Sequence, residues 1–152
     1  MKIVITGAKA TGKSTLARRV AAELGLPLFE KDQRVEELYA AQTGHRLTCR
    51  EIYKAAGADA FRVLEIAAAR ELATRDWCVV ATGGSSMLHP EVRQALRRDA
   101  VVVLLTAPPA VLWPRVQQLG LPAYLTGADP EQQFAKRVEM IEEVLAPYAD
   151  VR

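Results

Sequence analysis

Short apolar runs and longer amphipathic stretches alternate along the chain. The short runs are rich in β-branched residues and apolar at consecutive positions, which is typical of strands buried on both faces of a sheet. Parallel strands buried in this way need helices to connect them. The predicted strands are Lys2–Thr6, Leu28–Glu30, Trp77–Thr82 and Val101–Thr106.

The longer stretches carry apolar residues at helical spacing and predict the connecting helices. Gly25 is expected to end the first helix, because Pro27 follows and blocks its continuation. Alternating strands and helices predict an α/β fold in which a parallel sheet lies between helices, as a single domain over residues 1–152. The predicted helices are about Lys13–Leu24, Gln33–Thr43, a segment starting at Thr48–Tyr53, Ala58–Thr74, Pro90–Arg98, Ala110–Leu119 and Pro130–Leu145.

Composition removes several classes of protein. The formal net charge is +2 and the basic residues are scattered, whereas a nucleic-acid surface needs a clustered basic stripe. No apolar run approaches the roughly 20 residues that cross a bilayer, so neither nucleic acid nor membrane is an expected partner. Cys49 and Cys78 form no CxxC pair, and we expect reduced thiols in a cytoplasmic monomer. His45 and His89 are expected on the surface.

A phosphate-binding loop follows the first predicted strand. The segment fits the pattern G-x-x-x-x-G-K-[ST] without a mismatch, and it opens a helix, as the motif requires. Backbone N–H groups of such a loop converge on phosphate oxygens, and the helix N-terminus adds partial positive charge. We therefore expect Mg-ATP as the cofactor, with Lys13 on the β- and γ-phosphates and the Ser14 hydroxyl on Mg²⁺. The predicted ATP-binding residues here are Gly7, Ala8, Lys9, Ala10, Thr11, Gly12, Lys13, Ser14 and Thr15.

Two carboxylates end the second predicted strand. The carboxyl ends of strands in a doubly wound sheet face the ligand crevice. Glu30 and Asp32 could therefore hold Mg²⁺ through water and accept a hydrogen bond from a substrate hydroxyl. The alternative is a charged turn with Asp32 as a helix N-cap, a position that Asp favours.

Two further groups follow in the chain. Arg62 and Glu65 are three residues apart on one helix face, which predicts either a surface ion pair or an arginine that Glu65 aims at a substrate anion. Gly83 and Gly84 follow the third strand, where missing side chains let the backbone approach a ligand closely. The alternative for the glycines is a simple loop.

In this order and spacing, the four groups resemble the shikimate kinases. The resemblance rests on Gly7–Thr15, Glu30-Lys31-Asp32, Phe61-Arg62-x-x-Glu65 and Ala81-Thr82-Gly83-Gly84-Ser85, and it covers roughly residues 1–106 well. It implies ATP-dependent transfer of a phosphoryl group to a hydroxyl of shikimate, which makes shikimate 3-phosphate.

The resemblance also implies a role for each matching residue. Lys13 would stabilise the transferring phosphoryl group, Ser14 would bind Mg²⁺, and Glu30 would lie in the second coordination sphere. Asp32 would bind the substrate hydroxyls and orient or deprotonate the attacking one. The remaining substrate-binding residues would be Arg62 on the carboxylate, with Gly83, Gly84 and Ser85 lining the pocket. Arg115 would pack on the adenine, residues 33–60 would form substrate-binding helices, and residues of about 115–130 would include a mobile lid, Gly120–Asp129.

Several residues depart from the family pattern. Glu30 replaces an aspartate, and Ser85 replaces the third glycine of a triplet and should narrow the pocket. The family carries a lid arginine before a proline, where this chain has Leu121, and no Lys or Arg occurs from residue 116 to residue 135. An arginine is also expected in the last helix, and Arg137 and Arg152 are the candidates to replace it.

The resemblance also bears on the number of strands in the sheet. The family continues into a fifth strand and a final helix, whereas this sequence stops at Arg152, so we expect a four-stranded core in the order 2-3-1-4. An incomplete sequence is the alternative explanation. Two alternatives to a shikimate kinase stay open: a related kinase that acts on another hydroxylated metabolite, and a non-catalytic ATP-binding regulator. Nucleotide kinases need an arginine-rich lid, and GTPases need an Asn/Thr-Lys-x-Asp motif, and this chain has neither.

Overall fold

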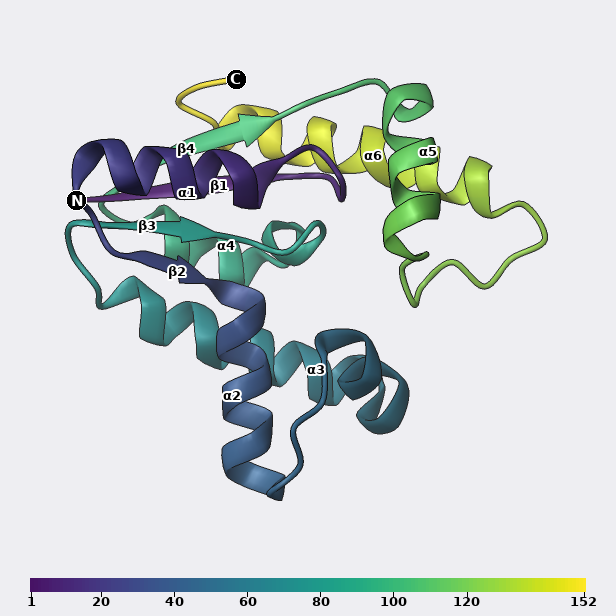
Figure 1. The fold of residues 1–152 in the computed structure, drawn as a ribbon, viewed down its shortest axis with the longest axis horizontal. Helices are drawn as coiled ribbons and strands as arrows, with labels where there is room; N and C mark the ends of the chain where they lie inside the picture. Colours follow the sequence, from purple (N-terminus) through teal and green to yellow (C-terminus); the bar gives the residue numbers. More distant parts are fainter.

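A four-stranded parallel sheet forms the centre of the molecule in a computed structural model that describes all residues, 1–152 (Figure 1). Its order is β2-β3-β1-β4, which confirms the predicted order and fold class. Each strand lies within one or two residues of its predicted bounds. The strands are β1 (Lys2–Gly7), β2 (Leu28–Glu30), β3 (Cys78–Ala81) and β4 (Ala100–Leu105).

The helices also follow the prediction, with two differences. The second helix begins at Lys31 rather than Gln33, directly after β2. The segments predicted at Thr48 and Ala58 form one long helix that Gly57 kinks, with φ 86° and ψ 170°. The helices are α1 (Lys13–Leu24), α2 (Lys31–Thr43), α3 (Cys49–Ala73), α4 (Pro90–Arg97), α5 (Pro109–Leu119) and α6 (Pro130–Leu145), with short 3₁₀ turns η1 (Ser86–Leu88) and η2 (Ala146–Tyr148).

Helices cover both faces of the sheet (Figure 1). On one face, Ala17 and Ala21 of α1 pack on Ile5 of β1 and on Val79 of β3. On the other face, the larger core combines β1, β3 and β4 with the C-terminal part of α3 and with α4, α5 and α6. Val35 of α2 packs with Ile52, Leu64 and Ala68 of α3 in a third cluster, and α2 and the start of α3 project beyond the β2 side of the sheet (Figure 1).

The outer edge of β4 carries an additional pairing that the sequence did not predict. Val151 forms an isolated parallel bridge with Val103, and the Leu104 N–H donates to the Val151 carbonyl oxygen at 2.9 Å. The Asp150 carboxylate accepts from the Val102 N–H at 2.8 Å. The sheet thus has four strands, as predicted, and this isolated bridge adds a single pairing beside β4.

Parallel register brings the functional loops to one edge of the sheet. Gly7 pairs with Leu105, Ile5 with Ala81, and Ala81 in turn with Glu30 of β2, so the strands end side by side. The phosphate loop, the start of α2 and the glycines after β3 all follow these ends. None of the helices is long and apolar enough to cross a membrane.

Candidate active site

The phosphate loop connects β1 to α1 through residues in unusual backbone conformations. Gly12 caps α1 at φ 92°, and Ala10 has φ 69°, both in the left-handed region that favours glycine. Gly7 lies against β4 so closely that a Cβ atom there would collide with the carbonyl oxygen of Leu105. These constraints explain the spacing of the two motif glycines: one permits close packing, and the other turns the chain into the helix.

Lys13 lies inside this loop. Its side chain is only 9% exposed, and its Nζ donates to the Ala8 carbonyl oxygen at 2.6 Å. Burial lowers the pKa of Lys13 to about 8, although Asp32 and Glu30 oppose the shift. The ammonium therefore lies inside the phosphate loop, held by the Ala8 carbonyl oxygen.

Ser14 and Glu30 face each other at the start of α1. The Ser14 hydroxyl donates to the Glu30 carboxylate at 3.4 Å. A hydroxyl and a carboxylate beside a phosphate loop are hard oxygen donors, the type of ligand that Mg²⁺ prefers. The residues present thus fit a phosphate-bound Mg²⁺.

Asp32 lies in the first turn of α2, with its side chain 48% exposed. It is not the N-cap, which is Glu30, so the capping alternative is wrong. Its carboxylate lies against the backbone of Gly83, where a Cβ atom would approach Oδ1 to 2.6 Å. Gly84 lies close to the backbone of Lys9, where a Cβ atom would approach the nitrogen to 3.0 Å. The two glycines thus let the chain after β3 pack closely against both Asp32 and the phosphate loop.

A buried ion pair holds this arrangement. Lys31, which is 0% exposed, donates to the Glu65 carboxylate of α3 at 2.5 Å. Ser86 donates to the same oxygen at 2.9 Å, and His89 Nε2 lies 3.5 Å from the other. The prediction that Glu65 holds Arg62 is therefore wrong: Glu65 points into the core, and Arg62 has no hydrogen bond or ion pair.

His89 also differs from the prediction. It lines the pocket beside Glu65 instead of lying freely on the surface. Burial lowers its pKa, as do Arg62, Lys31 and Arg137, while Glu65 opposes the shift. The lowered pKa favours the neutral form of the His89 imidazole, whose Nε2 lies 3.5 Å from the Glu65 carboxylate.

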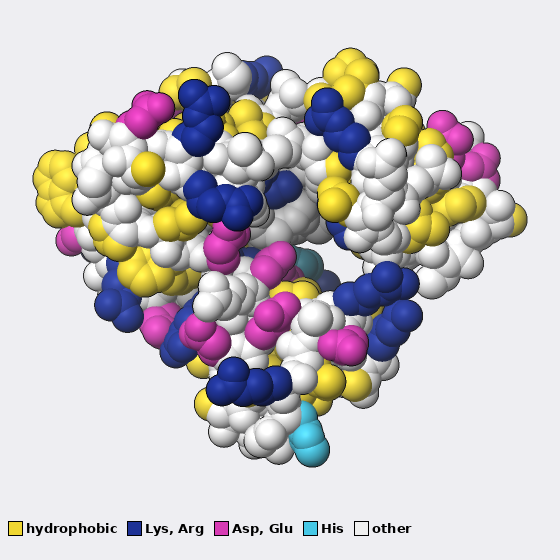
Figure 2. Space-filling view, viewed as in Figure 1, with side chains coloured by type: hydrophobic (Ala, Val, Ile, Leu, Met, Phe, Trp, Pro, Cys, Tyr) yellow, Lys and Arg dark blue, Asp and Glu magenta, His cyan; other side chains and the backbone are white.

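These elements enclose a pocket of about 380 Å³. Figure 2 shows this face of the molecule hollowed between the projecting α2–α3 part and the α5–α6 part, with basic and acidic side chains on the rim. The predicted residues that the pocket brings together are Ala8, Lys9, Asp32, Arg62, Gly83, Gly84 and Ser85. Lys13, Ser14 and Glu30 lie beyond the pocket lining, on the phosphate-loop side.

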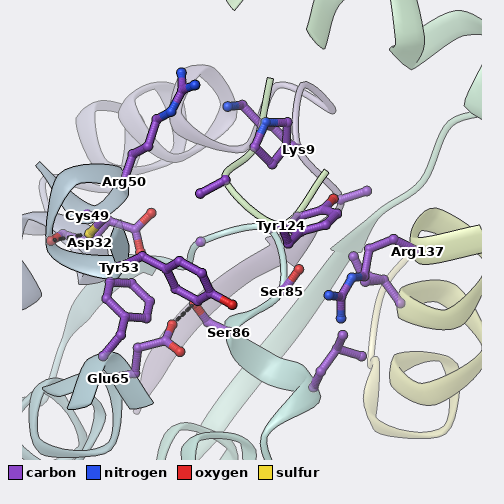
Figure 3. Close-up of a pocket in the computed structure, with 18 of the residues that line it drawn as sticks. Lys9, Asp32, Cys49, Arg50, Tyr53, Glu65, Ser85, Ser86, Tyr124 and Arg137 are labelled. Atoms are coloured by element: carbon purple, nitrogen blue, oxygen red, sulfur yellow. Dashed lines mark hydrogen bonds between the residues drawn. The ribbon is translucent and has the colours of Figure 1, made fainter. Parts of the chain in front are cut away.

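The far wall of the pocket comes from the lid and α6. Arg137 stacks on Tyr124, with its guanidinium carbon 4.5 Å from the ring centre (Figure 3). Both residues line the pocket, whereas Arg152 does not. Of the two candidates for the last-helix arginine, Arg137 is therefore the one in position.

Two other basic contacts involve the phosphate loop. Lys9 donates to the Gly120 carbonyl oxygen at 2.9 Å, which ties the loop to the start of the lid. Arg115 donates to the Ala10 carbonyl oxygen at 3.3 Å. The sequence also gave no sign of Arg50, which lines the pocket near Lys9, because one arginine in a polar helix start is not distinctive.

Residues 9–151 match the protein family described as "Shikimate kinase". The chain belongs to the shikimate kinase family. A shikimate kinase of Symbiobacterium thermophilum is 37% identical over 132 residues, which cover 86% of this chain and 72% of that protein. A shikimate kinase of Bartonella quintana is 31% identical over 90% of this chain, which spans only 62% of the relative's length.

Solved structures agree with this family. A shikimate kinase from Acinetobacter baumannii in complex with shikimate has a TM-score of 0.80 and 25% identity, over 99% of this chain and 80% of that one. A shikimate kinase from Bacteroides thetaiotaomicron has a TM-score of 0.78 at 24% identity, over 99% of this chain and 84% of that one, and so supports the fold. A gluconokinase from Sinorhizobium meliloti shares the fold less closely, with a TM-score of 0.55 at 24% identity, over 93% of this chain and 74% of that one. The resemblance to the shikimate kinases is thus confirmed.

The buried ion pair predicts a large effect on stability. Glu65→Ala leaves the Lys31 ammonium buried without a carboxylate, so we expect the free energy of unfolding to fall by about 3–5 kcal/mol in urea denaturation. The double change Lys31→Met/Glu65→Leu removes both charges and should recover most of this loss. Arg62→Ala, on the same helix, should change stability by less than about 0.5 kcal/mol. A Glu65→Ala protein as stable as the wild type would contradict the described role of the pair.

Lys13 predicts proton uptake on nucleotide binding. Because its pKa is about 8, roughly half of the ammonium is deprotonated at pH 8, and phosphates beside it would raise that pKa. We therefore expect Mg-ATP binding at pH 8 to take up about half a proton, and affinity to weaken as pH rises further. Titration calorimetry in two buffers of different ionisation enthalpy measures the uptake. Lys13→Met should abolish it, and equal heats in both buffers for the wild type would disprove the assignment.

Proposed function

We propose that this chain transfers the γ-phosphoryl group of ATP to a hydroxyl of shikimate, giving ADP and shikimate 3-phosphate. The observation that carries the proposal is the position of Asp32. Its carboxylate lies in a pocket between the phosphate loop and a set of cations, and Gly83 holds it there by close contact. A base at the junction of a phosphate site and an anion-binding pocket is the arrangement that phosphoryl transfer to a hydroxy acid needs.

The phosphate side of the site would be built from the loop residues. Backbone N–H groups from Gly7 to Thr15 would hold the phosphates, and the Lys13 ammonium would neutralise charge on the group that is transferred. Ser14 would bind Mg²⁺, with Glu30 accepting from its water ligands. When bound there, Mg²⁺ would supply positive charge that offsets the negative charge of the phosphates.

The acceptor side would bind shikimate between α2, α3 and α6. Asp32 would accept a hydrogen bond from the attacking hydroxyl and take its proton as the new bond forms. Arg62 and Arg137 would bind the carboxylate, since both line the pocket and Arg137 is held in place by Tyr124. Gly83, Gly84 and Ser85 would complete the wall that packs against the ring of the substrate.

The remaining assignments concern access to the site. The lid, Gly120–Asp129, would close over both substrates and exclude water, and its Tyr124 lines the pocket and contacts Arg137. Arg115 would pack on the adenine, consistent with its contact with the phosphate loop. We propose a monomer in the cytoplasm, where ATP is available and Cys49 and Cys78 remain reduced.

Turnover of ATP should depend on shikimate and on the Asp32 carboxylate. Release of ADP from Mg-ATP should rise strongly when shikimate is added, and Asp32→Asn should lower kcat by about 100-fold or more because the base is lost. Glu37→Gln, at an exposed position on the same helix, is the matched control and should behave as the wild type. If ADP release is independent of shikimate but rises with another hydroxylated acid, the acceptor is that compound. If no acceptor stimulates ADP release, the chain is a binding protein and the proposed activity is wrong.

The contact between Gly83 and Asp32 gives a second prediction about turnover. Gly83→Ala would place a methyl group 2.6 Å from the Asp32 carboxylate and push it out of position. We expect kcat to fall by at least about tenfold, because a displacement near 1 Å at a reacting group has large effects. Gly44→Asn is the control, since it keeps a left-handed helix end far from the pocket. Full activity of a folded Gly83→Ala protein would show that Asp32 need not be held by this contact.

A further inference from the structure

Two cationic side chains lie close together where the phosphate loop contacts the start of the lid. Lys9 belongs to the loop, and Arg50 lies in the first turn of α3. Figure 3 shows their charged ends directed toward each other on one side of the pocket, with Arg137 on the other side. Their closeness also affects titration: burial lowers the pKa of Lys9 most, and the Arg50 charge lowers it further.

Neither cation is neutralised by a carboxylate. Arg50 is exposed and makes no hydrogen bond or ion pair, and Lys9 donates to the uncharged carbonyl group of Gly120. Asp32 is close enough to raise the pKa of Lys9, but it is also 3.5 Å from the Lys31 ammonium. Two like charges that face each other across open space repel, and an anion between them would remove that repulsion. This end of the pocket is therefore built for a strongly charged anion.

The position of the pair identifies which anion it receives. Lys9 is part of the loop that carries Lys13, and the Lys9 backbone packs against Gly84 beside Asp32. Arg50 faces the start of the lid, where a Cβ atom on Gly120 would lie 3.6 Å from its Nη1. The pair thus lies where the phosphate loop meets the start of the lid, in the pocket that Asp32 also lines, whereas Arg137 lies on the other side of that pocket.

Phosphoryl transfer requires positive charge at this place. Negative charge spreads over the equatorial oxygens of the transferring group, and a cation there accelerates the reaction greatly. The lid has no cation to offer, because residues 116–135 contain no Lys or Arg. We infer that Arg50, on α3, supplies the positive charge for the transferring group. Lys9 holds the start of the lid through its hydrogen bond to Gly120. The inference rests on the proposed kinase activity and identifies a catalytic residue for it.

The chemical step balances with Arg50 unchanged. The acceptor hydroxyl oxygen forms a bond to the γ-phosphorus as the bond from that phosphorus to the β–γ bridging oxygen breaks. The bridging oxygen keeps the electron pair and leaves with ADP, and the hydroxyl proton passes to Asp32. Arg50 only donates hydrogen bonds to the equatorial oxygens, so its contribution should be larger in the transition state than in the substrate complex.

The test compares Arg50→Ala with Arg46→Ala, a second exposed arginine without a hydrogen bond or ion pair that lies outside this pocket. We expect Arg50→Ala to lower kcat about 100-fold or more, with KM for shikimate changed by less than about threefold. Added guanidinium should restore part of kcat, and Arg46→Ala should match the wild type. A kcat within about threefold of the wild type, or a rise in KM for shikimate at constant kcat, would overturn the inference.

A second readout separates this inference from the proposed function. ADP with aluminium fluoride and Mg²⁺ mimics the transferring group, and titration calorimetry measures its affinity without turnover. Arg50→Ala should weaken binding of this mimic at least about tenfold while binding of ADP alone stays unchanged. If the wild type shows no shikimate-dependent turnover, the proposed function fails, and the mimic still decides the role of Arg50. Equal affinity for the mimic in both proteins would reject that role.

Discussion

The buried pair of Lys31 and Glu65 connects α2, α3 and the loop after β3, three of the elements that line the acceptor side of the pocket. Lys31 opens α2 next to Asp32, Glu65 lies one turn after Arg62 on α3, and Ser86 attaches the loop after β3 to the same carboxylate. A charged pair in the core is costly to desolvate, so it persists only when its geometry satisfies both partners. Here the Glu65 carboxylate accepts from Lys31 and from Ser86, and His89 lies against its second oxygen.

This pair also explains how one pocket keeps its phosphate-binding side apart from its acceptor-binding side. The parallel sheet fixes the phosphate loop at the edge where its strands end, and the Lys31–Glu65 pair fixes Asp32 relative to that edge. Arg137 reaches the pocket from α6, outside this framework, and is positioned by Tyr124 of the lid. The acceptor side of the pocket thus has one wall that the Lys31–Glu65 pair fixes. Its other wall includes Tyr124 of the lid, the segment that we expect to move.

Local sequence signals predicted the sheet, the order of its strands and the phosphate loop. Apolar runs and the glycine motif depend on residues that are neighbours in the chain, which is why the predicted bounds of α1, β2 and α6 agree with the structure. The start of α2 was missed because Lys31 looks like a surface residue, and only Glu65, 34 residues later, makes its burial possible. For the same reason the sequence suggested an Arg62–Glu65 pair that the fold does not form. Arg50 was missed because its position over the phosphate loop depends on how α3 packs.

The central claim is that phosphoryl transfer to shikimate takes place at Asp32, between the phosphate loop and the cations of the pocket. Phosphorus NMR of the protein incubated with Mg-ATP and shikimate tests it most directly, because it identifies the product. The account predicts a new phosphomonoester signal that grows in step with ADP. Growth of inorganic phosphate alone, or an unchanged spectrum in the presence of folded protein, would contradict it.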